Sequence, residues 1–152
     1  MDIYEYLLTE AESEGLIVKE FPLIGYDGLI KGNHIAISKN LTQTEKSCVL
    51  AEELGHYYTT VGSILDQSDI GNRKQEHRAR MIAYNKMVGL LGIIEAYKER
   101  CQNLAEMAEH LRVSESFLKE TLERYRMKYG CRVEVDNYII FFEPQLAVIE
   151  KL

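Results

Sequence analysis

The chain of 152 residues has no tryptophan, only two prolines and no long apolar run. Without about 18 consecutive apolar residues, the sequence predicts no membrane-spanning helix. The N-terminal stretch lacks the basic-then-apolar pattern of a secretory signal peptide. The three cysteines are odd in number and widely spaced, a pattern that favours reduced thiols over a disulfide framework. We therefore expect a cytoplasmic protein.

The chain also has no excess of basic residues. The sequence has 18 Lys and Arg against 24 Asp and Glu, which gives a formal net charge of −6. A large non-specific nucleic-acid surface needs a basic footprint, so we expect no nucleic-acid partner of that kind. The apolar share of 46% is enough for a buried core. A chain of this length is one ordinary domain, or one domain with a small appendage.

The spacing of apolar residues predicts an α+β protein whose first part alternates helices and short strands. Thr42 and Glu45 form a capping-box pattern, which marks the start of the second helix. Gly15 is placed to end the first helix. The predicted elements are a helix over 2–14, strands over 18–21, 28–31 and 34–38, a helix from residue 42 to 58–60, a loop over 61–72 and a helix over 73–90.

After Leu91 and Gly92 the pattern changes to three closely spaced helical segments and a β-hairpin. These are predicted at 93–101, 104–111 and 115–129, with hairpin strands at 132–135 and 138–142. We therefore divide the chain into one domain over residues 1–91 and a helical C-terminal part with a β-hairpin over 92–152.

The most informative pattern is Glu-Glu-Leu-Gly-His at residues 52–56. Glu52 and His56 are four residues apart, so they share one helical face and can bind one metal ion. A carboxylate oxygen binds zinc at about 2.0–2.2 Å, as an imidazole nitrogen does. The simpler interpretation is a solvated helix with acidic residues beside a histidine. Three features favour a metal site: the short strands before the helix, Glu76 on the next helix, and Gly55, which permits close backbone approach.

These residues resemble the ImmA/IrrE family of metallo-endopeptidases. The resemblance is carried by residues 50–60 and by the helix in which Glu76 is followed by Ala79 and Ala83. It implies a minimal zincin-like domain and a zinc-dependent endopeptidase that cleaves or inactivates a phage-type repressor protein. The family pattern makes His56 and Glu76 metal ligands and Glu53 the general base. Glu52 stands where the family has its first histidine, so the chain departs from the pattern at one ligand.

A Glu52–His56–Glu76 site carries two formal negative charges, which leave a bound zinc ion formally neutral. Such an ion acidifies its bound water less than one held by two histidines. Oxygen ligands also admit manganese or another divalent ion. Other residues are expected to have smaller roles or none. Tyr57, Tyr58 and His77 are candidates to stabilise an oxyanion, Cys48 is expected to be buried as a small apolar residue, and His34, His110, Asp66 and Asp69 are not expected to bind metal.

Residues 104–118 resemble a helix-turn-helix, and the hairpin that follows resembles a wing. A recognition helix needs basic residues to contact phosphates. Residues 103–129 contain as many acidic as basic side chains, and Glu115, Glu120 and Glu123 lie on the supposed recognition helix. We therefore expect a structural or protein-binding role for this segment. If it binds DNA, the phosphate contacts would come from Arg124, Arg126 and Lys128.

Three functions remain open at this stage. The first is a metal-dependent endopeptidase that acts on a repressor. The second is a metal-poor relative that regulates a repressor by binding without cleavage, which the Glu52 replacement favours. The third is a small helix-turn-helix regulator that binds DNA. The sequence indicates neither the metal nor the cleavage site nor the oligomeric state.

Overall fold

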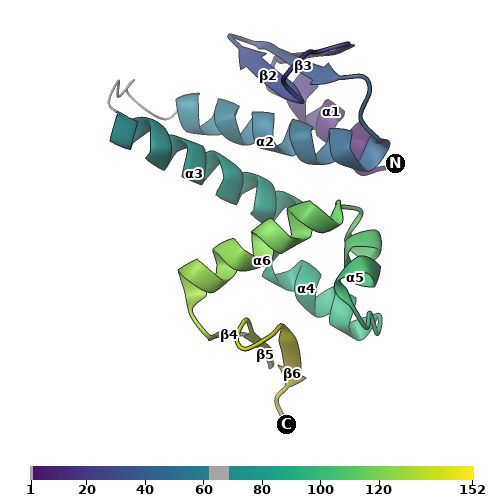
Figure 1. Cartoon of the computed structure of the whole chain (residues 1–152), viewed down its shortest axis with the longest axis vertical. Helices are drawn as coiled ribbons and strands as arrows, with labels where there is room; N and C mark the ends of the chain where they lie inside the picture. Colours follow the sequence, from purple (N-terminus) through teal and green to yellow (C-terminus); the bar gives the residue numbers. More distant parts are fainter. Residues whose placement is uncertain (1, 62–68) are drawn as a thin grey trace. The chain divides into compact units, whose positions relative to one another are not determined.

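The computed structural model describes residues 2–61 and 69–152, and its architecture is α+β (Figure 1). The chain forms two compact units, Met1–Lys86 and Met87–Leu152. The division comes slightly before the boundary expected at residues 91 and 92. Among the described helices, none has an apolar stretch long enough to cross a lipid bilayer.

The first unit begins with helix α1 (Ile3–Ser13). Asp2 caps it, since the Glu5 backbone N–H donates a 2.8 Å hydrogen bond to the Asp2 side chain. Leu7 and Ala11 are fully buried on its inner face. Gly15 follows the helix with φ +77°, a left-handed conformation that glycine adopts without strain. The predicted end of the first helix is thereby confirmed.

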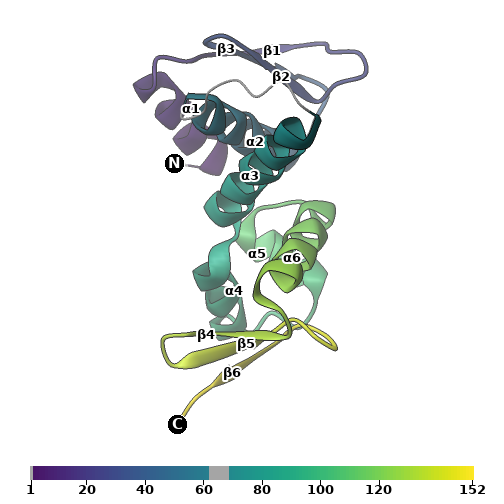
Figure 2. The same cartoon turned by 90° about the vertical axis from the view of Figure 1, so that its left-hand side faces the viewer.

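A three-stranded sheet follows, made of β1 (Ile17–Phe21), β2 (Gly28–Lys31) and β3 (His34–Ser38). The strand order is β1-β3-β2, with β1 parallel and β2 antiparallel to β3. Ile35 and Ile37 of β3 are buried, and helices α1 and α2 lie on the same side of the sheet (Figures 1 and 2). The order leaves β2 at an edge.

Helix α2 (Gln43–Val61) begins at the predicted capping box. The Thr42 backbone N–H donates to the Glu45 carboxylate at 3.0 Å, and the Glu45 N–H donates to the Thr42 hydroxyl at 3.2 Å. Leu50, Ala51 and Leu54 form its buried face.

Helix α3 (Asp69–Met87) begins earlier than the predicted residue 73. Gly71 is typical of the loop that the pattern predicts over 61–72, but one glycine costs a helix only about 1 kcal/mol, which the rest of a long helix offsets. Within this loop the sequence also predicts one helical turn at Ile64 and Leu65, and these two residues and Asp66 lie outside the described residues.

The second unit contains helices followed by a small sheet. Asn103 and Ser114 cap α5 and α6 through side-chain hydrogen bonds to backbone N–H groups. Its core includes Leu118, Tyr125 and Ile140. The elements are α4 (Gly89–Lys98), α5 (Leu104–Leu111), α6 (Glu115–Tyr129), β4 (Arg132–Val135), β5 (Tyr138–Phe141) and β6 (Ala147–Glu150).

The predicted hairpin is present as β4 and β5, and β6 adds a third antiparallel strand that the sequence analysis missed. Its four residues give too short an alternation to be recognised by pattern. The strand exists because it pairs with β5, with Ile139 opposite Ile149. The helical segment expected to start at residue 93 starts at Gly89, so the prediction was wrong by one turn.

Candidate functional site

The close packing of α2 on α3 creates the site. A Cβ atom at Gly55 would collide with the backbone carbonyl oxygen of Ala79, so only glycine permits this approach. Ala79 and Ala83 are fully buried and keep the facing side of α3 equally small. His56 follows Gly55 in α2, and Glu76 precedes Ala79 by one turn in α3. The helix contact therefore brings these two side chains together.

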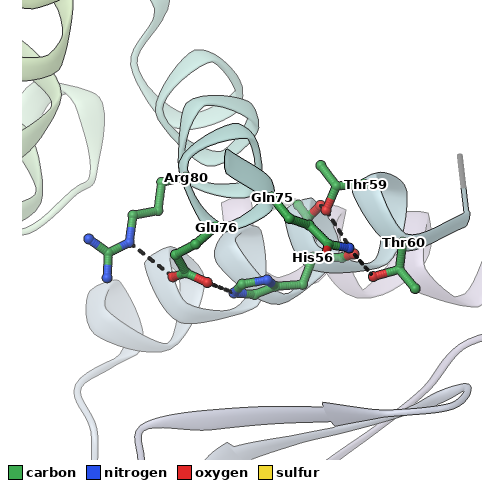
Figure 3. A network of polar contacts seen from close by, with 7 residues as sticks. His56, Thr59, Thr60, Gln75, Glu76 and Arg80 are labelled. Carbon is green, nitrogen blue, oxygen red and sulfur yellow. Dashed lines mark hydrogen bonds and ion pairs between the residues drawn. The ribbon is translucent and has the colours of Figure 1, made fainter. Parts of the chain in front are cut away.

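His56 and Glu76 form a pair between the two helices. The His56 Nε2 atom lies 3.3 Å from Glu76 Oε2, and the two side chains are 27% and 46% exposed (Figure 3). The second carboxylate oxygen of Glu76 is bound by Arg80, whose Nε atom lies 3.2 Å from Oε1. The two oxygens of Glu76 thus have different partners.

Glu53 lies next to this pair and is only 8% exposed. Burial, with smaller contributions from the negative charges of Glu52 and Glu76, raises its pKa to about 7. A Cβ atom at Gly28 would collide with Val49 and come within 3.3 Å of Glu53 Oε1, so β2 passes very close to this carboxylate. A carboxyl group with such a pKa exchanges a proton readily at neutral pH.

A cleft of about 620 Å³ contains these groups. Edge strand β2 and Tyr26 form one wall, and α2 and α3 form the other. Near the cleft, Gln75 of α3 donates a hydrogen bond to the Thr60 hydroxyl of α2 at 3.2 Å (Figure 3). The residues that line the cleft are Tyr26, Gly28, Leu29, Ile30, Glu53, His56, Thr60, Gln75 and Glu76.

The structure brings together three of the four predicted site residues. Glu53, His56 and Glu76 line the cleft, whereas Glu52 is not among the lining residues. Glu52 is partly exposed on α2. It still acts on the site through its charge, which contributes to the raised pKa of Glu53.

The donor geometry can be compared with that of a zinc centre. Two ligands bound at about 2.1 Å with a tetrahedral angle between them are about 3.4 Å apart. The 3.3 Å between His56 Nε2 and Glu76 Oε2 fits two such positions. Within the described part of the chain, no three His, Cys, Asp or Glu side chains are placed to hold one ion. His56 and Glu76 thus suit a divalent metal, while the third ligand position is not formed by these side-chain conformations.

The predicted oxyanion candidates lie elsewhere. The Tyr57 hydroxyl donates to Glu14, which follows α1, and the Tyr58 hydroxyl donates to Glu10 of α1. His77 is exposed and does not line the cleft. Cys48 is buried, as expected. Arg80 and Gln75 were not predicted from the sequence. Arg80 is four residues after Glu76, a spacing that predicts a side-chain pair on one helix and so was available as a signal.

The basic residues of α6 were the candidates for phosphate contacts. The Arg126 guanidinium binds Glu123 at 2.6 Å and Glu143 at 2.8 Å. The Lys128 ammonium lies 5.3 Å from the centre of the Tyr129 ring. Two carboxylates thus occupy the Arg126 guanidinium, one of the three basic groups from which phosphate contacts were expected.

Comparison with known proteins supplies the family. A search among curated proteins found no match to the chain. Residues 15–123 match the peptidase family described as the IrrE N-terminal-like domain (Peptidase_M78). The match covers well over half of the chain and includes both helices of the cleft. The chain therefore belongs to the IrrE N-terminal-like domain family of peptidases, as the resemblance of its motif predicted.

Proposed function

We propose that this protein is a metal-dependent endopeptidase that acts in the cytoplasm on a repressor-type protein. The observation that carries the proposal is the cleft, in which Glu53, His56 and Glu76 meet beside an edge strand. The family assignment supports the peptidase class. The repressor as substrate rests on the resemblance to the ImmA/IrrE family alone.

His56 and Glu76 are the proposed metal-binding residues, with Glu52 as the third donor. Zinc is the expected ion, and the two carboxylates also suit manganese. When bound, a divalent ion acidifies water and polarises a carbonyl group.

Glu53 is the proposed general base. Because its pKa is about 7, a substantial fraction of the carboxyl is ionised at neutral pH and can accept a proton. The protonated form can then return the proton to a leaving amine. Its burial keeps the carboxylate poorly hydrated.

Strand β2 is the proposed site for the extended substrate backbone. It is an edge strand, so one row of its backbone N–H and C=O groups has no partner strand among the described residues and can pair with a peptide. Gly28 brings this strand close to Glu53, so a peptide that pairs with β2 lies near the base.

A peptidase assay tests the proposal. The purified protein, supplied with zinc or manganese, is incubated with a library of peptides, and new N-termini are identified by mass spectrometry. We expect cleavage by the parent and by the matched Glu12→Gln variant, whose glutamate is exposed on α1. We expect at least a 100-fold slower reaction with Glu53→Gln. No cleavage by the parent, or equal cleavage by Glu53→Gln, would reject the endopeptidase.

A regulator that binds a repressor without cleaving it is the second candidate. Two observations favour it: Glu52 replaces the first histidine of the family pattern, and Glu52 does not line the cleft with the other site residues. This function would be supported if the parent and Glu53→Gln both bind a repressor protein and neither produces new N-termini. A DNA-binding regulator has less support because Arg126 is already paired with two carboxylates.

A further inference from the structure

The sheet of the first unit has a second face, opposite the one that α1 and α2 cover (Figures 1 and 2). Ile35 and Ile37 of β3 point to the covered side, so His34 and Ala36 point to the other. Strand register then assigns the neighbouring residues to the same side. We call this the open face, and it consists of Ile17, Lys19 and Phe21 of β1, Leu29 and Lys31 of β2, and His34, Ala36 and Ser38 of β3, of which Ser38 is buried.

The open face exposes large apolar side chains. Ile17, Phe21 and Leu29 are 42%, 48% and 42% exposed. In the loop between β1 and β2, Ile24 and Tyr26 are 93% and 62% exposed. Most of the strongly exposed large apolar residues described in this unit are therefore gathered within residues 17–29. Such a concentration marks an interaction surface, whereas scattered exposed residues do not.

The charge of the open face is opposite to that of the chain. Lys19 and Lys31 are exposed on it beside the exposed His34, although the net charge of the chain is −6. Glu20, the acidic residue of β1, lies on the covered side, where it binds the Tyr4 hydroxyl and Lys46. Asp27 is an exposed acidic residue at one end of the face, where its backbone oxygen accepts a hydrogen bond from the Ser38 N–H. The face thus combines apolar side chains with positive charge.

The open face is continuous with the cleft. Leu29 belongs to both, and Tyr26, next to the face, also lines the cleft. A substrate segment that leaves β2 can therefore pass directly over the sheet. We propose that the open face binds an acidic segment with apolar side chains in the protein substrate, next to the segment held in the cleft. This inference rests on the proposed function and names the chemistry of its substrate.

Charge reversal provides the test. The full chain carrying Glu53→Gln is titrated into two fluorescein-labelled 20-residue peptides, and binding is followed by fluorescence anisotropy at low salt. The peptides share leucine and valine positions and differ in having glutamate or lysine at every polar position. We expect at least tenfold tighter binding of the glutamate peptide. Adding Lys19→Glu and Lys31→Glu should reverse this preference, and Phe21→Ser should weaken the binding of both peptides.

The matched control is Lys74→Glu with Arg78→Glu, which changes the net charge equally at exposed positions of α3. It should keep the preference of the parent, and circular dichroism should show all variants folded. The proposal is overturned if the parent has no preference, or if the control reverses it as well. It is also overturned if the open-face lysines govern binding to vesicles of phosphatidylserine and phosphatidylcholine while neither peptide binds. If the glutamate peptide is still preferred but the parent protein cleaves no peptide, the peptidase function is rejected and the open face remains a protein-binding surface.

Discussion

At the scale of single residues, the site depends on one glycine that carries no chemistry. Gly55 lets α2 and α3 approach until His56 and Glu76 are 3.3 Å apart. Because the obstacle to a larger residue is the backbone of α3, a side-chain rotation cannot relieve it. The geometry of the polar groups therefore follows from a packing requirement.

The substitution Gly55→Ala should separate the helices and destabilise the first unit. Overpacking of a tight contact costs about 1–3 kcal/mol, more than alanine gains in helix propensity. Urea denaturation measures the change in the free energy of unfolding. Gly92→Ala in α4 is the matched control, because its added Cβ meets only the Leu111 Cδ2 atom at 3.1 Å, the end of a flexible side chain. Equal stability of Gly55→Ala and the parent would contradict the close contact.

Arg80 should act as a positioning residue for Glu76. By holding Oε1, it leaves Oε2 directed at His56. Loss of such an outer partner typically weakens metal binding 10- to 100-fold. We expect about tenfold weaker zinc binding for Arg80→Ala by competition with a chelator, with partial recovery in Arg80→Lys. Arg78→Ala, which removes an exposed arginine from the same helix, should bind as the parent does. Unchanged affinity in Arg80→Ala would remove this role.

At the scale of elements, α1 is tied to α2 and α3 through one carboxylate. Glu10 accepts hydrogen bonds from Tyr58 of α2 and from Lys86 of α3, the latter at 2.8 Å. Burial would raise the pKa of Glu10, but the hydrogen bonds from Lys86 and Tyr58 and the Lys86 charge together hold it below its ordinary value.

A depressed pKa stabilises the folded state above the pKa of the unfolded state, and this contribution is lost as the pH falls through the folded value. Glu10→Gln should therefore cost about 1 kcal/mol at pH 7 and much less near pH 3. Urea denaturation at the two pH values measures the difference, with Glu12→Gln as the exposed control from the same helix. A cost for Glu10→Gln that does not change with pH would contradict the assignment.

Elements with strong local signals could be predicted from the sequence, and those set by tertiary pairing could not. The capping box at Thr42 and Glu45 and the cap at Ser114 are local hydrogen bonds, so both helix starts were predicted. Strand β6 forms by pairing with β5, and its own short sequence pattern does not indicate that pairing. The start of α3 was missed because its composition resembled a loop.

At the scale of the whole molecule, the four site residues were predicted from sequence motifs, whereas their relative positions depend on the fold. Spacing placed Glu53 and His56 on one helix but did not show how α3 crosses it. The cleft is lined by Glu53, His56 and Glu76, while Glu52 is not among its lining residues. The likeness to the peptidase family extends from Gly15 to Glu123, so it begins after α1 and ends within α6.

The central claim is that His56 and Glu76 hold a divalent metal ion, and elemental analysis of the untagged protein tests it most directly. After dialysis against zinc or manganese and then against metal-free buffer, we expect one ion per chain in the parent. The His110→Ala variant, which removes an exposed histidine of α5, should retain that ion. His56→Ala should lose it. A parent that holds no metal, or a His56→Ala variant that retains it, would contradict the account.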